Sequence, residues 1–273
     1  MLRDELSNSM VIQRFCLPVT LHCNLRCRLC AERSPYYERP YYPEMSNLVA
    51  QIGRLFEIVD RIELLDLTGG EPLLRKDLHI FIRELYRSYD QRIGRLRLTT
   101  NGTILPTEEL LASLQDWGNR VYLIVDQYPV SKRVPDIAKH LSGAGVPFEV
   151  RDYTNSLHCD GWVDYGDFSK KHDAPEAQAL FKKCMVPRLH FFTCMVDGVL
   201  FPCARARLLY EQGITKDCLN IMDGPCSDIR EKLRQFLSVS ALESCAYCGG
   251  LCEDSKRFRP AEQLDTLIGN KEL

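Results

Sequence analysis

Two hydrophobic patterns alternate along the first half of the chain. Continuous or alternating apolar runs, which are typical of strands, occur at 13–22, 61–70, 95–102, 120–126 and 146–153. Between these runs, apolar residues recur every three to four positions, which predicts helices at 46–59, 77–89, 107–117 and 131–142. Asp77 and Thr107 are suited to cap two of these helices. The alternation predicts parallel strands joined by right-handed crossovers.

We therefore expect an α/β fold with a partial (β/α)6 barrel similar to a TIM barrel. No dinucleotide-binding glycine pattern follows the first strand, which disfavours a Rossmann sheet. In barrels of this type, functional groups gather at the carboxyl ends of the strands. The cysteine-rich loop after 13–22, the TGGEP segment, the TTNG segment and Asp126 all occupy such ends, so we expect them to lie close together.

The alternation stops after residue 153. Residues 154–180 are polar and irregular, and we expect a domain boundary there. The segment 189–203 (LHFFTCMVDGVLFPC) predicts a β-hairpin with an Asp-Gly turn, and a helix follows at 228–238. The predicted organisation is a barrel core over 13–165 and a small α+β extension, a β-hairpin plus helix, over 180–255.

Composition adds little except for cysteine. The chain has 273 residues, 45% hydrophobic and 26% charged, with a net charge of −2, which is ordinary for a globular protein. No basic stripe suggests nucleic acid or a membrane surface, and we expect neither partner. The first residues do not resemble a signal peptide, and no apolar run is long enough to span a membrane, so we expect a cytoplasmic protein.

Thirteen cysteines are unusual in a reducing compartment, where clustered cysteines more often bind metal. We interpret Cys16, Cys159, Cys218 and Cys226 as ordinary thiols, because they lie outside the clusters.

The first cluster lies in VTLHCNLRCRLCAER, residues 19–33, with the spacing C-x3-C-x2-C at Cys23, Cys27 and Cys30. Three thiolates on one short loop can hold three corners of a cubane iron–sulfur cluster. One iron would then stay open to a small molecule, as the open position of a catalytic zinc does. A structural zinc site completed by another residue, such as His22, is the alternative.

This loop and a second motif together resemble the radical S-adenosylmethionine (SAM) superfamily over about residues 13–153. The second motif ends the second strand and consists of Gly69, Gly70, Glu71 and Pro72. The resemblance implies that the three cysteines bind a 4Fe-4S cluster whose open iron is chelated by SAM. It implies reductive cleavage of SAM to a 5′-deoxyadenosyl radical that abstracts a substrate hydrogen. It also implies an external electron donor such as flavodoxin or ferredoxin.

The resemblance assigns the GGEP segment to the SAM amino group. Glycines allow a close backbone approach, Glu71 can accept a hydrogen bond from an ammonium, and Pro72 fixes the turn. Leu29 stands where the family often has an aromatic residue near the adenine, so it offers apolar contact without stacking.

Three further residues are candidates on the same resemblance. Asn101 and Asp126 are similar to strand-end positions that touch SAM or substrate in relatives, and we assign Asp126 a catalytic role. Arg151 can pair with the SAM carboxylate through its guanidinium. The alternatives are a turn role for Asn101 and an ion pair with Asp152 for Arg151.

A second cysteine set surrounds the predicted hairpin and follows the last helix. Its arrangement resembles the shorter, twitch form of the SPASM/twitch extension, which implies one auxiliary iron–sulfur cluster of the 4Fe-4S type. The layout is most similar to that of the 2-deoxy-scyllo-inosamine dehydrogenases. That resemblance implies the ligands Cys184, Cys203, Cys245 and Cys248, with Cys194 and Cys252 in reserve. A structural zinc held by the same residues is the alternative.

A cluster with four protein ligands is suited to electron transfer. We therefore predict a radical SAM oxidoreductase that dehydrogenates a small polar molecule such as a sugar, amino-sugar or cyclitol. The alternatives are a peptide- or protein-modifying maturase and a redox-neutral epimerase. A glycyl-radical activase is disfavoured because the extra cysteines lie far from the first loop, and a binding protein that no longer cleaves SAM is disfavoured by the intact motifs.

Two loops are expected to contact the substrate, because loops over a barrel mouth carry specificity. They are residues 34–43 and 154–170, and their candidate contact residues are Tyr36, Tyr37, Trp162 and Tyr165.

Overall fold

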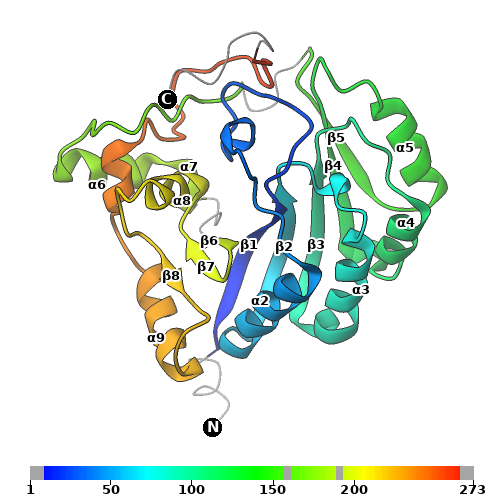
Figure 1. Ribbon diagram of the computed structural model, residues 1–273, viewed down its shortest axis with the longest axis horizontal. Helices are drawn as coiled ribbons and strands as arrows, with labels where there is room; N and C mark the ends of the chain where they lie inside the picture. The colour runs from blue at the N-terminus through cyan, green and yellow to red at the C-terminus, as the bar shows by residue number, and fades with distance from the viewer. Residues whose placement is uncertain (1–8, 156–160, 189–192, 265–273) are drawn as a thin grey trace.

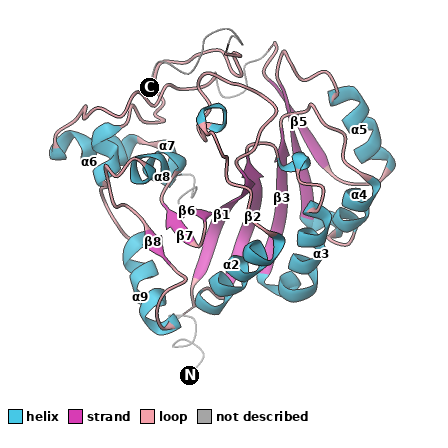
Figure 2. Cartoon of the chain, in the orientation of Figure 1, coloured by secondary structure: helices cyan, strands magenta, loops and turns pink. Residues whose placement is uncertain are grey.

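The structure is a computed structural model that describes residues 9–155, 161–188 and 193–264. An eight-stranded sheet with the order β5-β4-β3-β2-β1-β6-β7-β8 crosses the molecule (Figures 1 and 2). Its strands are β1 (Val11–Thr20), β2 (Arg61–Gly69), β3 (Ile93–Thr100), β4 (Val121–Gln127), β5 (Phe148–Asp152), β6 (Thr193–Val196), β7 (Val199–Phe201) and β8 (Leu219–Asn220).

The helices fall into two groups along the chain. Those of the first half are α2 (Met45–Ile58), α3 (Leu78–Tyr89), α4 (Glu108–Gln115) and α5 (Val134–Gly143). Those of the second half are α6 (Ala174–Lys183), α7 (Met185–Arg188), α8 (Ala204–Glu211) and α9 (Cys226–Leu237). Within the described ranges, no helix combines the length and the apolar character that crossing a membrane requires.

Strands β1 to β5 are parallel and lie in chain order, as expected from the alternating pattern. Helices α2 to α5 cover one face, where Phe15 and Leu17 pack into the main hydrophobic core (Figure 1). Because side chains alternate across a strand, Arg14 and Cys16 point to the opposite, inner face. The sheet does not close, so the predicted α/β fold with a partial barrel is confirmed.

The predicted hairpin, formed by β6 and β7, belongs to the same sheet as the barrel strands. Strand β6 pairs in parallel with β1, placing Cys194 opposite Cys16, and so extends the barrel sheet. A parallel sheet that starts at β1 leaves that strand with an open edge, and β6 covers it. The turn is the expected one, since Asp197 and Gly198 both have positive φ, as a two-residue hairpin turn requires. Residues 189–192 of this prediction lie outside the described residues.

The prediction that 154–180 is irregular is wrong for its last part. Helix α6 begins after Asp173, whose carboxylate accepts from the Glu176 backbone N–H at 2.9 Å. The Glu176 carboxylate accepts in return from the Asp173 N–H at 2.9 Å, which completes a capping box. The D-x-x-E spacing was the available signal, but the polar face of this helix hides its period.

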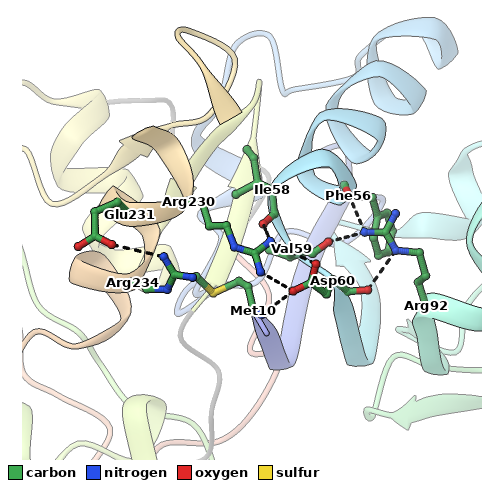
Figure 3. Close-up of polar contacts among 9 residues, drawn as sticks. All are labelled: Met10, Phe56, Ile58, Val59, Asp60, Arg92, Arg230, Glu231 and Arg234. Carbon is green, nitrogen blue, oxygen red and sulfur yellow. Dashed lines mark hydrogen bonds and ion pairs between the residues drawn. The ribbon is translucent and has the colours of Figure 1, made fainter. Parts of the chain in front are cut away.

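Helix α9 is fastened to the amino end of the barrel sheet by a group of polar contacts (Figure 3). Arg230 donates to the Ile58 carbonyl at 2.9 Å and to the Asp60 carboxylate. Asp60 also accepts from the Met10 N–H at 2.7 Å, and Arg92 donates to the Asp60 carbonyl at 3.0 Å. Thus the second half of the chain is held against the first at the end of the sheet opposite to the cysteine loop.

Candidate active site

The GGEP segment is packed directly against the backbone that enters the cysteine loop. The Gly70 N–H donates to the Thr20 carbonyl at 2.8 Å, and the Glu71 N–H donates to the His22 carbonyl at 2.8 Å. A Cβ on Gly69 would lie 1.9 Å from the Thr20 oxygen, and one on Gly70 would lie 2.2 Å from the His22 oxygen. Both glycines are therefore needed to bring the two motifs together.

Glu71 is fully buried, and its carboxylate already has three donors. It accepts from the Leu73 N–H at 3.0 Å, from the Thr100 hydroxyl at 2.9 Å and from the Asn101 N–H at 2.7 Å. Burial raises its pKa to about 7, against the effect of these donors. The side chain thus joins the ends of β2 and β3. Because these donors already occupy the Glu71 carboxylate, the backbone carbonyls of this segment would have to make any contact with the SAM ammonium group. Pro72 is buried and begins a short 3-10 turn, as its fixed φ favours.

N–H groups approach two of the three loop sulfurs. Cys23 Sγ accepts from the Leu25 N–H at 3.4 Å and lies 3.7 Å from the Asn101 amide nitrogen. Cys27 Sγ accepts from the Gln263 amide at 3.3 Å. Hydrogen bonds of this kind stabilise thiolate sulfur, as iron–sulfur ligation needs.

Gln263 belongs to a C-terminal segment that the sequence reasoning did not place at the site. Residues 261–264 run beside the cysteine loop, where the Arg28 N–H donates to the Glu262 carbonyl at 2.8 Å (Figure 1). The Leu264 N–H donates to the Arg26 carbonyl at 2.7 Å. No local pattern announces this contact, because it joins segments more than two hundred residues apart.

Burial raises the pKa of Cys23 to about 11 and that of Cys27 to about 12, and it also raises the pKa of Cys30. Metal binding to these thiols must therefore release protons. Over the described ranges, no three His, Cys, Asp or Glu side chains approach closely enough to hold one metal ion.

A cavity of about 340 Å³, here called the mouth cavity, opens between the cysteine loop and the ends of β4 and β5. Leu29 and Asp126 line it, together with Tyr128, Tyr153 and Trp162. The rings of Tyr128 and Tyr153 stack with centroids 4.9 Å apart. The sequence reasoning expected Leu29, Asp126 and Trp162 near the site, but it missed Tyr128 and Tyr153, which supply the aromatic surface that Leu29 lacks.

Asp126 is buried, and one of its two carboxylate oxygens has no hydrogen-bond partner among the described residues. The other accepts from the Tyr128 hydroxyl at 3.1 Å. Burial raises the pKa of Asp126 to about 6. Arg151 is its partner across the β4–β5 ladder and lowers that pKa, so Arg151 faces Asp126. Arg151 Nε also lies 3.8 Å from a carboxylate oxygen of Glu149. Asp152, the alternative partner, accepts from the Thr154 N–H at 2.7 Å.

Asn101 is buried at the end of β3, where its amide nitrogen donates to the Asn24 side chain at 3.0 Å. Its side-chain oxygen accepts from the Thr103 N–H at 3.1 Å, which is the expected turn geometry. The residue thus combines a turn contact with a contact to the cysteine loop.

A second cavity of about 300 Å³, here called the inner cavity, lies between the inner face of the sheet and the second cysteine set. Five of the six cysteines of the second set line it, namely Cys184, Cys194, Cys203, Cys245 and Cys248. Burial, together with the neighbouring thiols, raises the pKa of Cys203 to about 12 and that of Cys248 to about 11. The predicted ligands thus line the same cavity. Cys252 does not line this cavity.

Cys194 and Cys16 lie side by side on β6 and β1, and both line the inner cavity. The prediction that Cys16 is unclustered is therefore incomplete, because the sheet brings it to this cavity. Cys226 accepts from Arg54 at 2.8 Å on the outside of the barrel. Cys159 lies outside the described residues.

The two tyrosines predicted in the first substrate loop make structural contacts. The Tyr36 hydroxyl donates to the Arg28 carbonyl at 3.0 Å, and Tyr37 contacts Arg207 and Glu211, each at 2.6 Å. Tyr165, from the second loop, lines both the mouth cavity and the inner cavity. It therefore stands where the two cavities adjoin.

Comparison with known proteins agrees with these motifs. Residues 17–146 match the radical SAM superfamily. A GTP 3′,8-cyclase from Nautilia profundicola is 38% identical over 114 residues, which cover 40% of this chain and 33% of that protein. A GTP 3′,8-cyclase from Aquifex aeolicus is 37% identical over 121 residues, which cover 43% of this chain and 35% of that protein. The match thus spans about a third of the length of these curated relatives.

Solved structures are similar over most of the chain. BtrN in complex with AdoMet and 2-DOIA superposes with a TM-score of 0.54 and 20% identity, covering 92% of this chain and 99% of that chain. Native anSMEcpe with bound AdoMet superposes with a TM-score of 0.55 and 17% identity, covering 89% of this chain and 88% of that chain. These likenesses show a shared fold that includes the C-terminal half.

Proposed function

Because residues 17–146 match the radical SAM superfamily, we propose that the chain is a radical SAM enzyme that dehydrogenates a small polar molecule. In this proposal residues 13–165 carry the SAM chemistry and residues 180–255 carry an auxiliary cluster. Cys23, Cys27 and Cys30 would hold a 4Fe-4S cluster, and the GGEP backbone would bind the SAM amino group. An external electron donor, such as flavodoxin or ferredoxin, would be the redox partner.

The side chains at the two cysteine sets fit these cofactors. Three thiols on one loop, two of them approached by N–H donors, suit a cluster with one open iron. The mouth cavity offers aromatic surface for an adenine and the unpartnered Asp126 oxygen for a polar group. When bound, these groups supply a 5′-deoxyadenosyl radical for hydrogen abstraction, and the auxiliary cluster supplies a site that accepts the remaining electron.

One observation carries the dehydrogenase proposal: a single inner cavity is lined both by polar side chains of the barrel strands and by Cys184, Cys203, Cys245 and Cys248. A substrate in this cavity would lie beside the auxiliary ligands, so electron transfer over a short distance is feasible. With four protein ligands, the auxiliary cluster would have no open iron. The chain's own contribution is to position the substrate and to keep water out.

The size of the inner cavity favours a small molecule over a peptide. Its volume of about 300 Å³ is at the lower end of ligand pockets, and part of it would be taken by the auxiliary cluster. A peptide substrate would have to insert a single side chain. The peptide complex of anSMEcpe, with a TM-score of 0.53, keeps this alternative open to the same test.

A radical cyclisation of a purine nucleotide is a second candidate. It is favoured by identities of 37–38% to GTP 3′,8-cyclases over the matched segment. Anaerobic incubation with GTP, SAM and reductant, followed by mass spectrometry of the products, separates it from dehydrogenation.

The first test is the iron content of the protein purified and reconstituted without oxygen. We expect about eight irons per chain, falling to about four in the Cys23/Cys27/Cys30→Ala variant and to about four in Cys245/Cys248→Ala. The matched control is Cys218→Ala, which lies outside both cysteine sets and should keep about eight.

The second test is the reaction itself. With reductant and a sugar or cyclitol deuterated only at the reacting carbon, the protein should transfer that deuterium into 5′-deoxyadenosine. The product should be about two mass units lighter than the unlabelled substrate, because dehydrogenation removes the deuterium together with one proton. About four irons in the wild type, or a product of unchanged mass, would contradict the dehydrogenase proposal and favour a redox-neutral reaction.

A further inference from the structure

Helix α8 begins at a cysteine of the second set, and its first turn carries a buried arginine. Cys203 is the N-cap residue of this helix, and its Sγ accepts from the Ala206 N–H at 3.4 Å. Arg205 lies in the same turn and lines the inner cavity together with Cys203 and Cys248. Positive charge therefore reaches the second cysteine set from two sources, which are the amino end of α8 and the guanidinium of Arg205.

Arg205 is held by backbone oxygens and an aromatic ring. Its guanidinium donates to the Tyr247 carbonyl at 2.6 Å and to the Asp167 carbonyl. The Phe168 ring lies against it, with 5.0 Å between the ring centroid and Cζ, and Arg205 is only 4% exposed. Among the described residues no carboxylate forms an ion pair with Arg205, since the Asp167 carboxylate accepts from Lys171 at 2.6 Å.

The acidic side chains that line the inner cavity are paired with other arginines. Glu32 accepts from Arg207 at 2.8 Å, and Asp66 accepts from Arg97 at 2.8 Å. A buried charge needs a partner, and the groups left to balance Arg205 are the sulfurs of the second cysteine set. Ligation as thiolate would give these sulfurs the opposite charge.

The sulfur of Cys248 lies within the electrostatic reach of Arg205. Burial raises the pKa of Cys248 to about 11, whereas the Gly250 N–H, which donates to its Sγ at 3.2 Å, and the Arg205 charge both lower it. The Arg205 guanidinium is also bonded to the carbonyl of the preceding residue, Tyr247. Nearby charge and hydrogen bonds to sulfur set the potential of an iron–sulfur cluster, and a cation favours the more negative, reduced state.

We propose that Arg205 is a positioning residue that raises the reduction potential of the auxiliary cluster by fixing one buried positive charge beside Cys203 and Cys248. This inference rests on the proposed function, since it names the residue that makes the auxiliary cluster an electron acceptor. The step that it favours is a one-electron transfer. The substrate radical gives one electron to the auxiliary cluster and one proton to water, so the substrate is oxidised and the cluster is reduced.

The test is the midpoint potential of the auxiliary cluster, measured by redox titration and electron paramagnetic resonance. The background is the Cys23/Cys27/Cys30→Ala variant, in which the auxiliary cluster alone should give a signal. Arg205→Gln should lower the equilibrium constant for reduction about tenfold, which is about 59 mV for a one-electron couple. Arg205→Lys keeps the charge and should stay close to the background protein, which a purely structural role of the guanidinium would not predict.

The matched control is Arg92→Gln. Arg92 also donates to backbone carbonyls, those of Phe56 at 2.6 Å and Asp60 at 3.0 Å, and lies 4.9 Å from the centroid of the Phe56 ring. It belongs to the contacts at the amino end of the sheet, opposite to the cysteine loop (Figure 3). Its replacement removes the same kinds of contact without changing the charge near the cysteines, so the potential should not change.

A second variant serves if Arg205→Gln does not keep the auxiliary iron. Phe168→Leu leaves the guanidinium in place but removes the ring that shields it from water. Because water screens charge, this variant should lower the potential in the same direction and by less. An unchanged potential in the iron-loaded variant, or an equal loss in Arg205→Lys or Arg92→Gln, would overturn the inference.

Failure of the proposed function gives a different result. Dehydrogenation of sugars and cyclitols by the protein with both clusters is measured in parallel. A lowered potential in Arg205→Gln without any dehydrogenated product would contradict the proposed function and leave the role of Arg205 standing. Dehydrogenation with an unchanged potential in Arg205→Gln would refute only the role of Arg205, and the absence of a second cluster would refute both.

Discussion

Gly70 shows at the scale of one residue how the two sequence motifs depend on each other. Its missing side chain lets the GGEP backbone donate directly to the backbone entering the cysteine loop. A Cβ there would lie 2.2 Å from the His22 oxygen and 2.6 Å from its carbonyl carbon. Both atoms belong to the backbone, so neither can move aside as a flexible side chain would.

We therefore expect Gly70→Ala to displace the cysteine loop and to lower the iron content from about eight to about four per chain, with the second cysteine set still loaded. The matched control is Gly143→Ala at the end of α5, where a Cβ meets nothing within 4 Å. That control should keep its iron. Full iron content in Gly70→Ala, measured beside it, would show that the loop tolerates the shift.

Asp66 gives a prediction for pH. Arg14 and Cys16 on β1, Arg97 on β3 and Arg151 on β5 face it, and burial outweighs the arginines to raise its pKa to about 7. The folded state therefore holds this proton more tightly than the unfolded state, so the contribution of Asp66 to stability falls as pH rises from about 4 to about 7.

Asp66→Asn lacks this titration. The free energy of unfolding of this variant, relative to the wild type, should thus rise between pH 5.5 and pH 7.5, by at most about 1.4 kcal/mol per pH unit, and stay level above that range. Its melting temperature should follow the same trend. The measurement is thermal unfolding of both proteins in matched buffers. A constant difference across this range would mean that Asp66 is ionised throughout.

At the scale of elements, α9 depends on a side chain that crosses to the barrel. Arg230 reaches Asp60 and the Ile58 carbonyl, whereas Arg234, one turn later, pairs with Glu231 in its own helix at 3.3 Å (Figure 3). Ile229 and Leu233 of the same helix are buried in the main core. The polar contacts thus supplement an apolar docking face.

Arg230→Gln should therefore destabilise the protein modestly, by about 0.5–1 kcal/mol, because the pair with Asp60 is partly exposed to solvent. Thermal unfolding should show a loss of about 1–4 °C. Arg234→Gln is the matched control and should change the melting temperature less. Equal losses in the two variants would place the docking energy of α9 in its apolar face alone.

At the scale of the whole molecule, the C-terminal segment closes over the first cysteine loop. Gln263 donates to Cys27 Sγ across 236 residues of sequence, and the Arg28–Glu262 ion pair lies beside it at 2.7 Å. A hydrogen bond to a cluster sulfur stabilises the more negative, reduced state. A cluster held by the first cysteine loop would therefore have its potential shifted by the Gln263 amide.

Gln263→Leu should lower the midpoint potential of the first cluster by tens of millivolts, on the order of 1 kcal/mol for a one-electron couple. The potential is measured by a redox titration followed by electron paramagnetic resonance. Gln235→Leu, on the exposed side of α9, is the control and should leave the potential unchanged. An unchanged potential in Gln263→Leu would mean that this contact does not persist once the cluster is bound.

Local patterns were sufficient for much of the fold. The five parallel strands and four helices of the first half occur within a few residues of their predicted bounds, because each carries its own apolar period. The same applies to the cysteine loop and GGEP, since both lie at strand ends that a parallel sheet brings to one edge. Helix α6 was missed because most of its residues are exposed and its apolar period is weak.

The sequence by itself determined the chemistry that the protein can perform: which thiols are available, in what spacing, and at which ends of which strands. Only the tertiary structure decided what surrounds them. Several contacts join distant segments: the pairing of β6 with β1, the aromatic pair Tyr128 and Tyr153, the contact of Arg97 with Asp66, and the contact of Gln263 with Cys27. Such contacts arise from the packing of whole elements, and a local sequence period carries no information about which elements meet.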